Sequence, residues 1–351
     1  MKNHKRVTIK QVAREAGVST QTVSRVANEQ PDVAPDTRKR VKAVITRLGY
    51  RPNAIARSLI QRRSYTLGIV IAGLEYSGPS RTLNGITGMA EELGYGLLLK
   101  ELPSFNSNDV YHLLEWFLSR QVDGIIWAVP EVGDNRYWLE KKLPNLPIPL
   151  IFLTMENREG ISIVSINNYI GGKIATEHLL GLGRQRIAHI SGPLDWWESR
   201  QRKRGWHDAL QAARIHSEDH FCVEGTWSPR SGERAFRKLL DRYPGMDAVF
   251  VGNDQMALSV LHVACKENIN IPDELAVVGF DGIPEAAYFW PPLTTLHQNL
   301  HELGCTAVKE LISAIRASQD NQVETETKNL LIKPDLIIRQ STDPNSAVGR
   351  K

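Results

Sequence analysis

The sequence predicts a small α-helical helix-turn-helix headpiece followed by a two-lobed α/β domain with doubly wound parallel sheets. Residues 8–28 carry two short apolar helical patterns separated by a glycine. From residue 66 onward, apolar strand patterns alternate with helical patterns, which is typical of parallel sheets covered by helices. Charge divides the chain in the same way. Residues 1–63 hold 15 Lys and Arg against 4 Asp and Glu, whereas the rest of the 351 residues hold 28 against 35.

The segment 8–28, TIKQVAREAGVSTQTVSRVAN, encodes the helix-turn-helix residue by residue. Thr8 can cap a first helix whose apolar positions share one face. Gly17 supplies the positive φ that ends this helix, and Ser19 can cap a second helix that runs to about Asn28. The apolar residues of the second helix can face inward. Its polar residues then project from the first turns, where a recognition helix meets base edges.

The polar side chains of the second helix have the chemistry of DNA readers. Gln21 can bond bidentately to adenine, Arg25 can do so to guanine, and Thr20 can offer its methyl group to thymine. The basic charge of this part favours a polyanion such as DNA and binding that weakens with added salt. A helical hairpin with a solvated polar face is the alternative. We expect a major-groove DNA interface made by Thr8, Ser19, Thr20, Gln21, Ser24, Arg25 and Asn28.

A third helix is predicted to close the bundle. Pro35 suits its first turn, an apolar stripe follows, and Gly49 ends it. Its cap position is Ala34, which forgoes roughly 1 kcal/mol of capping free energy. The following stretch 54–60 is too short to form a helix alone in water, so we expect it to order only against another surface.

The strand patterns beyond residue 66 fall into two sets. Their continuous apolar runs are typical of strands buried in parallel sheets, and helical patterns lie between them. Two sets of this kind predict two doubly wound lobes. The first set is 67–71, 96–99, 124–129 and 150–153, and the second is 186–190, 248–252 and 275–281.

Several other classes of protein are excluded by the sequence. The three cysteines are widely separated, so we expect no disulfide or zinc framework and a reducing cytoplasm as the location. No apolar stretch follows the charged N-terminus, and none approaches the roughly 18 residues of a membrane span. His297 and His301 lie four residues apart without a third ligand nearby, so no metal site is expected. No phosphate-binding fingerprint or catalytic set is found, so neither a cofactor nor an enzymatic activity is expected.

Three stretches resemble the lac repressor-type (LacI/GalR) family of bacterial transcription regulators. They are TIKQVAREAGVSTQTVSRV, VAPDTRKRV and LGYRPNAIARSL, in the family's order and spacing. The resemblance extends to about Thr342. It implies a headpiece at 1–51, a hinge helix and linker at 52–65, periplasmic-binding-protein-like lobes at 66–342, and a tail at 343–351.

The resemblance also implies how DNA is held. Asn53, Ala56 and Leu59 match the family's hinge, where Ala56 and Leu59 would enter the minor groove when two hinge helices pair. The implied assembly is a homodimer on a pseudo-palindromic double-stranded operator. The tail after Ser341 lacks the apolar heptad helix of tetrameric members, so no tetramer is expected. The implied location is the cytoplasm, at the bacterial nucleoid.

The family's two lobes are joined by three crossovers, which the resemblance places near Asn167, His297 and Lys328. Lobe 1 would then comprise about 66–166 and 298–327, and lobe 2 about 167–297 and 328–342. A small effector would bind in the cleft between them.

Residues that follow the predicted strands carry the chemistry of this cleft, because ligands of open α/β lobes gather beyond the carboxyl ends of strands. Carboxylates and amides can bond vicinal hydroxyl groups, Arg can donate to their oxygens, and indole faces can cover the apolar side of a pyranose. A sugar effector is therefore expected. By resemblance, its contacts would be Trp196, Glu198, Arg202, Trp227, Asn253, Asp281 and Gln298.

These residues also have structural alternatives. Asn253 or Asp281 could cap a helix, and Trp196 or Trp227 could be ordinary packing. The chain also departs from the pattern of many sugar-binding members, which have Asp at two positions where this chain has Thr154 and Asn167.

Three functions are alternatives to a sugar-responsive repressor of carbohydrate-utilisation genes. By resemblance, purine-responsive members should have an Arg at a position near Trp196 and a small hydroxyl at a position near Glu198, and this chain does not have them at the matching positions. A solute-binding transport protein should have a signal peptide and no basic headpiece. A glycosidase would use Glu198 and Asp281 as an acid/base pair at a defined separation. The repressor, released from DNA by its sugar, is the expected function.

Overall fold

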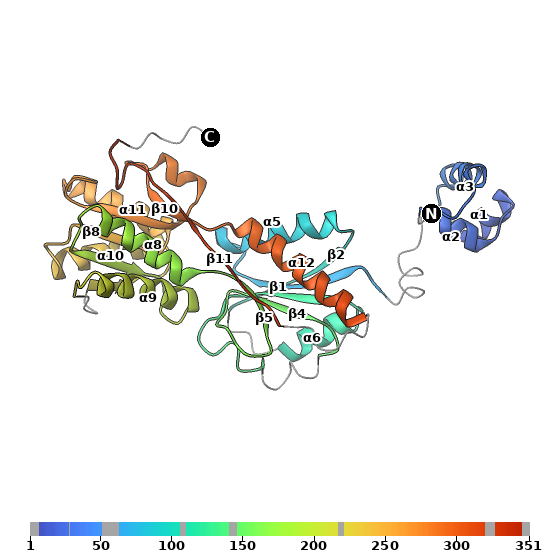
Figure 1. The fold of residues 1–351 in the computed structure, drawn as a ribbon, viewed down its shortest axis with the longest axis horizontal. Coiled ribbons are helices and arrows are strands. Elements are labelled where there is room, and N and C mark those ends of the chain that lie inside the picture. The colour runs from blue at the N-terminus through green and yellow to red at the C-terminus, as the bar shows by residue number, and fades with distance from the viewer. Residues whose placement is uncertain are drawn as a thin grey trace, which may run out of the picture. The chain divides into compact units, whose positions relative to one another are not determined.

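The computed structural model describes residues 7–27, 29–50, 63–105, 110–139, 146–216, 221–319 and 327–345 (Figure 1). The chain divides into two compact units, Met1–Tyr65 and Thr66–Lys351. Within the described ranges, no helix is long and apolar enough to cross a membrane. Four of the predicted DNA contacts, Asn28, Asn53, Ala56 and Leu59, lie outside the described residues.

The first unit contains three helices, α1 (Ile9–Ala16), α2 (Thr20–Ala27) and α3 (Pro35–Leu48). Thr8 caps α1 in a capping box with Gln11, and Gly17 ends it at φ 65°. Gly49 ends α3 in the same left-handed conformation, and Ala34 makes no side-chain cap. The three helices bury one core of Val12, Ala13, Ala16, Val23, Val26, Val41 and Val44. The predicted helix-turn-helix fold is confirmed.

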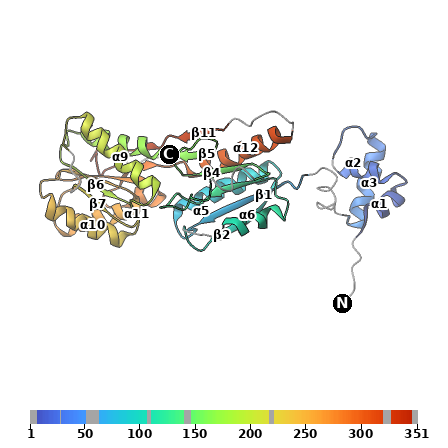
Figure 2. The ribbon, with the colours of Figure 1, turned by 90° about the horizontal axis from the view of Figure 1, so that it is seen from below.

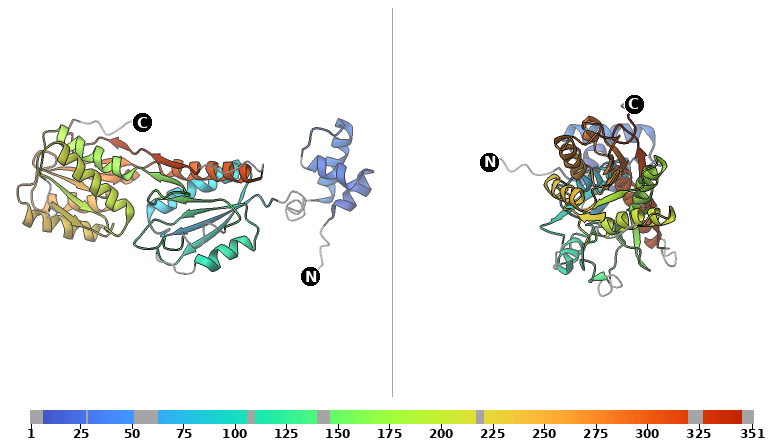
Figure 3. Two further views of the ribbon diagram at one scale, coloured as in Figure 1. Left: turned by 60° about the horizontal axis from the view of Figure 1, so that its bottom comes forward. Right: turned by 90° about the vertical axis from the view of Figure 1, so that its left-hand side faces the viewer.

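Lobe 1 is built on a six-stranded parallel sheet of order β11-β5-β4-β3-β1-β2. Its strands are β1 (Thr66–Ala72), β2 (Gly96–Leu102), β3 (Gly124–Ala128), β4 (Leu150–Leu153), β5 (Ser162–Ile166) and β11 (Asn329–Ile332). Its helices are α5 (Ser77–Glu92), α6 (Val110–Leu118) and α12 (Leu300–Gln319). The paired helices α5 and α12 lie on one face of the sheet and α6 lies on the other (Figure 3, left).

Lobe 2 repeats this architecture with the sheet order β12-β10-β9-β8-β6-β7, in which only β12 runs antiparallel to its neighbour. Its strands are β6 (Ile187–Ser191), β7 (Cys222–Glu224), β8 (Ala248–Val251), β9 (Ala276–Asp281), β10 (Thr294–His297) and β12 (Asp335–Ile337). Its helices are α8 (Asn168–Gly181), α9 (Trp197–Ala212), α10 (Pro229–Arg242), α11 (Asp254–Lys266) and the 3-10 helix η3 (Pro284–Tyr288). The predicted two-lobed fold is confirmed (Figure 2).

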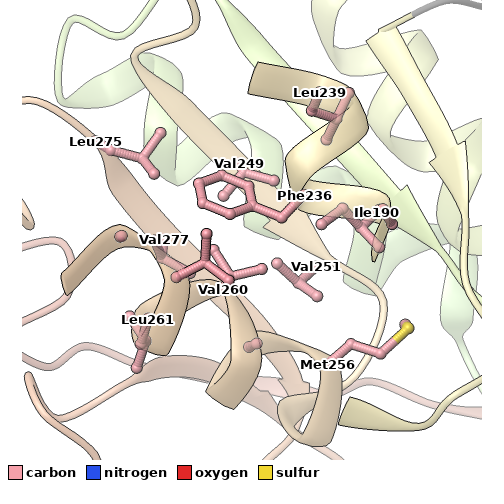
Figure 4. Packing of buried hydrophobic residues seen from close by; sticks show 14 of the residues in the cluster. Ile190, Phe236, Leu239, Val249, Val251, Met256, Val260, Leu261, Leu275 and Val277 are labelled. Carbon is pink, nitrogen blue, oxygen red and sulfur yellow. The ribbon is translucent and has the colours of Figure 1, made fainter. Parts of the chain in front are cut away.

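The central strands of each sheet are buried on both faces, which explains their continuous apolar patterns. The expectation of a buried strand at 96–99 was wrong, because β2 lies at the edge of its sheet and is half exposed. In β8, Val249 and Val251 join the core beneath α10 and α11, together with Phe236 (Figure 4). Ala248 and Phe250 alternate with them and join the core beneath α8 and α9. Period-two alternation therefore sends neighbouring residues of one strand into two different cores.

The third crossover lies between β11 and β12, at 333–334, and not near Lys328 as expected. Strand β11 belongs to the lobe 1 sheet, where Asn329 pairs with Ile163 of β5. The short segment NLLI was not predicted as a strand because its side chains lie at a sheet edge and are half exposed. The other two crossovers lie at Asn167, between β5 and α8, and at 298–299, between β10 and α12.

In each lobe, one pair of helices crosses with backbones in direct contact. A Cβ atom on Gly85 of α5 would clash with the carbonyl oxygen of His301 in α12. A Cβ atom on Gly172 of α8 would clash in the same way with that of Arg202 in α9. Glycine is therefore required by space at these crossings. The reciprocal glycines are Gly304 in α12 and Gly205 in α9.

Candidate functional site

The headpiece presents a polar face on α2. Thr20, Gln21 and Arg25 are exposed on this helix, whereas Val23 and Val26 are buried against the other helices. The exposed side chains are the predicted base-reading ones. The arrangement leaves one helix free to present them to a groove.

Two of the predicted DNA contacts have a structural task in the headpiece. The Thr8 hydroxyl accepts the Gln11 N–H at 3.4 Å, and the Ser19 hydroxyl accepts the Thr22 N–H at 3.1 Å. Both hydroxyls therefore cap helices. Helix N-termini also offer backbone N–H groups to phosphates, so a capping residue can lie beside DNA.

Arg25 forms an ion pair with Asp32, which lies in the loop before α3. The distance between Arg25 Nη1 and Asp32 Oδ2 is 3.2 Å, and both side chains are about half exposed. A pair this exposed contributes little to stability, roughly 0 to 1 kcal/mol. Arg25 can therefore exchange Asp32 for a base at small cost.

The two lobes of the second unit form a cavity of about 350 Å³ beyond the carboxyl ends of their strands. This is the place where ligands of doubly wound sheets bind, and the volume is at the lower end of the range for small-molecule sites. The structure brings all seven predicted effector contacts together in the wall of this cavity. They are Trp196, Glu198, Arg202, Trp227, Asn253, Asp281 and Gln298.

Arg202, in α9, joins several parts of the lobe 2 wall. Its Nε donates to Asn168 Oδ1 at 2.8 Å, and its Nη1 donates to the Gly252 carbonyl at 2.6 Å. The guanidinium carbon lies 3.8 Å from the centroid of the Phe280 ring, and Nη1 lies 3.8 Å from Asp281 Oδ1. Burial lowers the pKa of Arg202 and the charge of Asp281 raises it. The guanidinium is thus fixed and partly neutralised before any ligand arrives.

Glu198, in the first turn of α9, is only 9% exposed. Its Oε2 has no hydrogen-bond partner within the described residues. Burial raises the pKa of Glu198 to about 7, although the charges of Arg202 and Arg136 oppose this and that of Glu131 adds to it. A buried acceptor without a partner is costly, and Glu198 lines the cavity, so its carboxylate is a candidate acceptor for a ligand that donates a hydrogen bond.

Asp281 ends β9 beside a second buried carboxylate. Gln298 Nε2 donates to Asp281 Oδ1 at 2.6 Å, which ties lobe 2 to the second crossover. Burial raises the pKa of Asp281, and Arg202 opposes the rise. Asp254 accepts from the Thr295 hydroxyl at 2.6 Å, and its pKa is raised by burial and by the charge of Asp281. Asp281 is the member of this pair that faces the cavity.

Two indoles form the aromatic part of the wall. The Trp196 and Trp227 rings meet edge to face with centroids 5.8 Å apart, and Trp196 also packs on Phe105 of lobe 1 at 4.7 Å. The Trp227 ring fits only because Gly192 has no Cβ. Within the described residues, the buried Nε1 of Trp227 has no acceptor. Trp227 and Glu198 both line the cavity, and each has one buried polar atom without a partner among the described residues.

Three residues of the cavity wall have strained backbones. Thr154, Trp227 and Asp281 have φ values of 55°, 65° and 114°, in the left-handed region that favours glycine. Each follows or ends a strand. Strain of this kind concentrates at functional sites, where the surrounding structure holds a side chain in a required position.

Asn253 has the alternative role that the sequence left open, because it caps a helix. Its Oδ1 accepts the Met256 N–H at 2.9 Å, and its Nδ2 donates to the Trp227 carbonyl and to Gln255 Oε1. The amide is therefore engaged by the protein itself. Asn167 likewise caps α8, through the Ile170 N–H at 3.0 Å.

The lobe 1 side of the cavity was not predicted, apart from the attention drawn to Thr154. It comes from the segment after β1, the start of α5, and the ends of β3 and β4. The same strand-end rule that found lobe 2 could have found these residues, since each follows a predicted strand. They are Glu75, Tyr76, Ser77, Gly78, Pro79, Thr82, Ala128, Pro130 and Leu153.

The chemistry of the cavity follows from the groups that line it in the described parts of the chain. No group of three or more His, Cys, Asp or Glu is placed there to hold a metal ion. The cavity offers carboxylates, amides, a guanidinium and indoles, which are groups for binding hydroxyl-bearing molecules.

Two protein-family descriptions match this chain. Residues 8–53 match "Bacterial regulatory proteins, lacI family", and residues 176–342 match "Periplasmic binding protein-like domain". The first covers the headpiece, and the second covers most of lobe 2 and part of lobe 1.

Two solved structures match the fold over almost the whole chain. One is the lac repressor dimer bound to operator and the anti-inducer ONPF, with a TM-score of 0.82, 31% identity, and coverage of 96% of this chain and 99% of that one. The other is the transcriptional regulator CelR–cellobiose complex, with a TM-score of 0.69, 31% identity, and coverage of 96% and 100%.

Known relatives are similar to this chain in sequence along nearly their full lengths. Catabolite control protein A of Priestia megaterium is 34% identical over 339 residues, which are 96% of this chain and 99% of that protein. The ribose operon repressor of Escherichia coli K12 is 33% identical over 335 residues, which are 95% and 99%. With a headpiece, a two-lobed fold and relatives of this kind, the chain belongs to the lacI family of bacterial regulatory proteins.

Proposed function

We propose that this protein is a transcriptional repressor whose affinity for its operator is controlled by a neutral sugar or short glycoside bound between the lobes. The observation that carries the proposal is the cavity, in which the buried Arg202 and Glu198 of α9 meet Asp281 of β9 and the indoles of Trp196 and Trp227. Hydroxyl groups both donate and accept, so they match the carboxylates of Glu198 and Asp281 and the guanidinium of Arg202, which line the cavity. An indole face suits the apolar side of a pyranose.

The headpiece is the DNA-binding part in this proposal. Helix α2 enters the major groove with Gln21 and Arg25 on base edges, and the surrounding basic residues contact phosphates. The relatives' names support the two halves of the proposal, since they include an operon repressor and a regulator solved with cellobiose. Sugar binding then favours one arrangement of the lobes and releases the operator. The size of this effect is set by the difference in the sugar's affinity for the two arrangements.

The proposal is tested by a thermal-shift screen of neutral monosaccharides and disaccharides, with ribose, lactose and cellobiose included. Each sugar that raises the melting temperature is then added to an operator titration. We expect at least one sugar to stabilise the protein and to weaken operator binding. Stabilisation only by a purine or a charged metabolite would overturn the proposed ligand class.

Binding of the sugar is expected to depend on pH through Glu198. The proton on this carboxyl, whose pKa is about 7, competes with a sugar hydroxyl that donates to the carboxylate. Affinity should therefore fall as pH decreases, by about tenfold between pH 8 and pH 6. Glu198→Gln keeps the size and removes the titration, so its affinity should be nearly flat over this range in calorimetry. A parent protein with an equally flat profile would argue against this contact.

We further propose that the protein works as a homodimer and that exposed aromatics of lobe 2 contact a second copy of the chain. Tyr288, at the end of η3, is 88% exposed and Trp290 is 85% exposed. Large apolar side chains this open mark interaction sites, and two headpieces on a pseudo-palindrome need a two-fold partner. The related lac repressor was solved as a dimer on its operator.

Trp290→Glu should shift the dimer towards monomer, because it places a charge in the proposed interface. Light scattering at micromolar concentration should give a dimer mass for the parent and a lower mass for the variant. Leu182→Glu, at an exposed position beyond α8, is the control and should remain dimeric. A tetrameric parent, or a fully dimeric Trp290→Glu, would contradict the proposal.

A further inference from the structure

Besides the three crossovers, the lobes are joined by a short main-chain contact, here called the strap. Residues 131–133 of lobe 1 run antiparallel to residues 195–197 of lobe 2, with Val132 opposite Trp196. The Trp197 N–H donates to the Glu131 carbonyl at 3.0 Å, and the Gly133 N–H donates to the Asp195 carbonyl at 2.9 Å. The two lobes thus share a minimal piece of β-ladder.

The lobe 1 half of the strap is held by a buried polar network. Asn135 Oδ1 accepts the Val132 N–H at 3.2 Å, while Asn135 Nδ2 donates to the carbonyls of Phe105 and Pro130, each at 2.9 Å. The Glu131 side chain accepts the Glu156 N–H at 2.7 Å and pairs with Arg158. Both Glu131 and Asn135 are buried. These buried hydrogen bonds hold the main chain of residues 131–133 in the conformation that faces α9.

The lobe 2 half of the strap is the N-terminus of α9. Trp196 is the N-cap residue and Trp197 is the first residue of the helix. Glu198 follows directly, and Arg202 lies about one turn further on, so the contact holds the turn that carries the effector-binding side chains. Pro130 and Trp196, which flank the contact, both line the cavity. The strap is therefore part of the cavity wall.

We propose that the strap is a latch between the lobes, in which Asn135 positions the main chain of lobe 1 to grip the first turn of α9 and so sets the geometry of the effector site. The latch places Arg136 and Glu131, both of lobe 1, where their charges act on Glu198 of lobe 2. When the lobes separate, the strap breaks, and this electrostatic environment of Glu198 is lost. Lobe closure and completion of the effector site are thus one event.

The first test removes one donor without changing the helix. Pro is well accepted at the first helical position, and Trp196, at φ −83° and ψ 130°, already has the conformation preferred before Pro. Trp197→Pro therefore deletes the donor to Glu131, while the matched control Trp197→Ala loses the same indole and keeps the N–H. Hydrogen exchange of the ligand-free full-length protein is then compared at the Gly133 amide.

We expect the Gly133 amide to exchange roughly three- to tenfold faster in Trp197→Pro than in Trp197→Ala, the factor for one lost hydrogen bond. Amides in α12 should exchange equally in both variants. Equal exchange at Gly133 in the two variants would overturn the latch. This measurement uses no sugar, so a negative result would count against the latch and not against the proposed effector. Only the effect of the latch on the effector site rests on the proposed function.

A second variant approaches the strap from the other lobe. Asn135→Ala frees the Val132 N–H from its partner without touching α9, and we expect faster exchange of the Trp197 amide. If Trp197→Pro does not fold, this variant decides the matter. Unchanged protection of the Trp197 amide would then overturn the proposal, because Asn135 would have no effect across the lobes.

Discussion

Replacing Asp281 by alanine will remove the sugar response of the protein while operator affinity stays within about twofold of the parent value. The carboxylate ends β9 in the cavity wall, held by Gln298 and facing Arg202. Its loss removes a ligand contact and leaves a buried cation without its counter-charge, which is costly at a binding site. Nothing in the headpiece changes, so the DNA interface is retained.

Calorimetry with a sugar found in the thermal-shift screen measures the loss of sugar binding. Operator titration with and without that sugar measures the operator affinity and the lost sugar response. Asp241→Ala, which removes an exposed carboxylate from α10, is the matched control and should respond to sugar like the parent. Asp281→Asn should retain part of the response, since the amide can still accept from Gln298 or the sugar. An Asp281→Ala variant that binds the sugar as tightly as the parent would remove Asp281 from the site.

Arg25→Ala will weaken binding to the preferred operator by roughly 1 to 3 kcal/mol and relax specificity at one base pair. Arg25 is exposed on α2, and its only ion pair in the described headpiece is the surface contact with Asp32. The side chain is thus free to form two parallel hydrogen bonds with one guanine.

Fluorescence titrations with operator and with random DNA separate base reading from charge. Arg25→Lys is the control, because it keeps the charge and loses the planar fork, so it should bind random DNA like the parent and the operator more weakly. An equal loss by Arg25→Ala on both DNAs would show that Arg25 contacts only phosphate.

Sequence predicted the headpiece in detail because its signals are local. The capping by Thr8 and Ser19, the left-handed Gly17 and Gly49, and the uncapped Ala34 are properties of a few adjacent residues. Such positions fix helix ends wherever they occur. No knowledge of distant contacts was needed.

In lobe 2, the predicted strand ends located Asn253 and Asp281, whereas Trp227 and Gln298 follow strands that the sequence did not reveal and were expected only from the family resemblance. What each side chain does there was less predictable. The amide of Asn253 is used by the Met256 N–H and by Trp227, a set of partners that depends on the loop conformation at Trp227. Strands β5, β7, β10 and β12 were missed because they are short and carry polar residues. Strand β11 was missed as well, which misplaced the third crossover.

The strap was beyond prediction for a different reason. Its hydrogen bonds are made by main-chain atoms of residues 131–133 and 195–197, which any residue except proline can supply. Only the three-dimensional closure of the lobes brings these segments together. Asn135, whose buried amide supports the contact, has no sequence pattern that distinguishes it from a surface asparagine.

The glycine contacts between α5 and α12 and between α8 and α9 have a mechanical consequence. Helices whose backbones touch cannot slide past one another, because any displacement drives a carbonyl oxygen into a Cα atom. Each lobe should therefore move as a rigid body, with the hinge motion confined to the three crossover segments between the lobes. Two crystal forms, with and without sugar, should give a difference-distance matrix that is flat within each lobe and non-zero only between lobes. Substituting Gly85 by alanine should disturb that flatness in lobe 1, because the added Cβ would meet the carbonyl oxygen of His301.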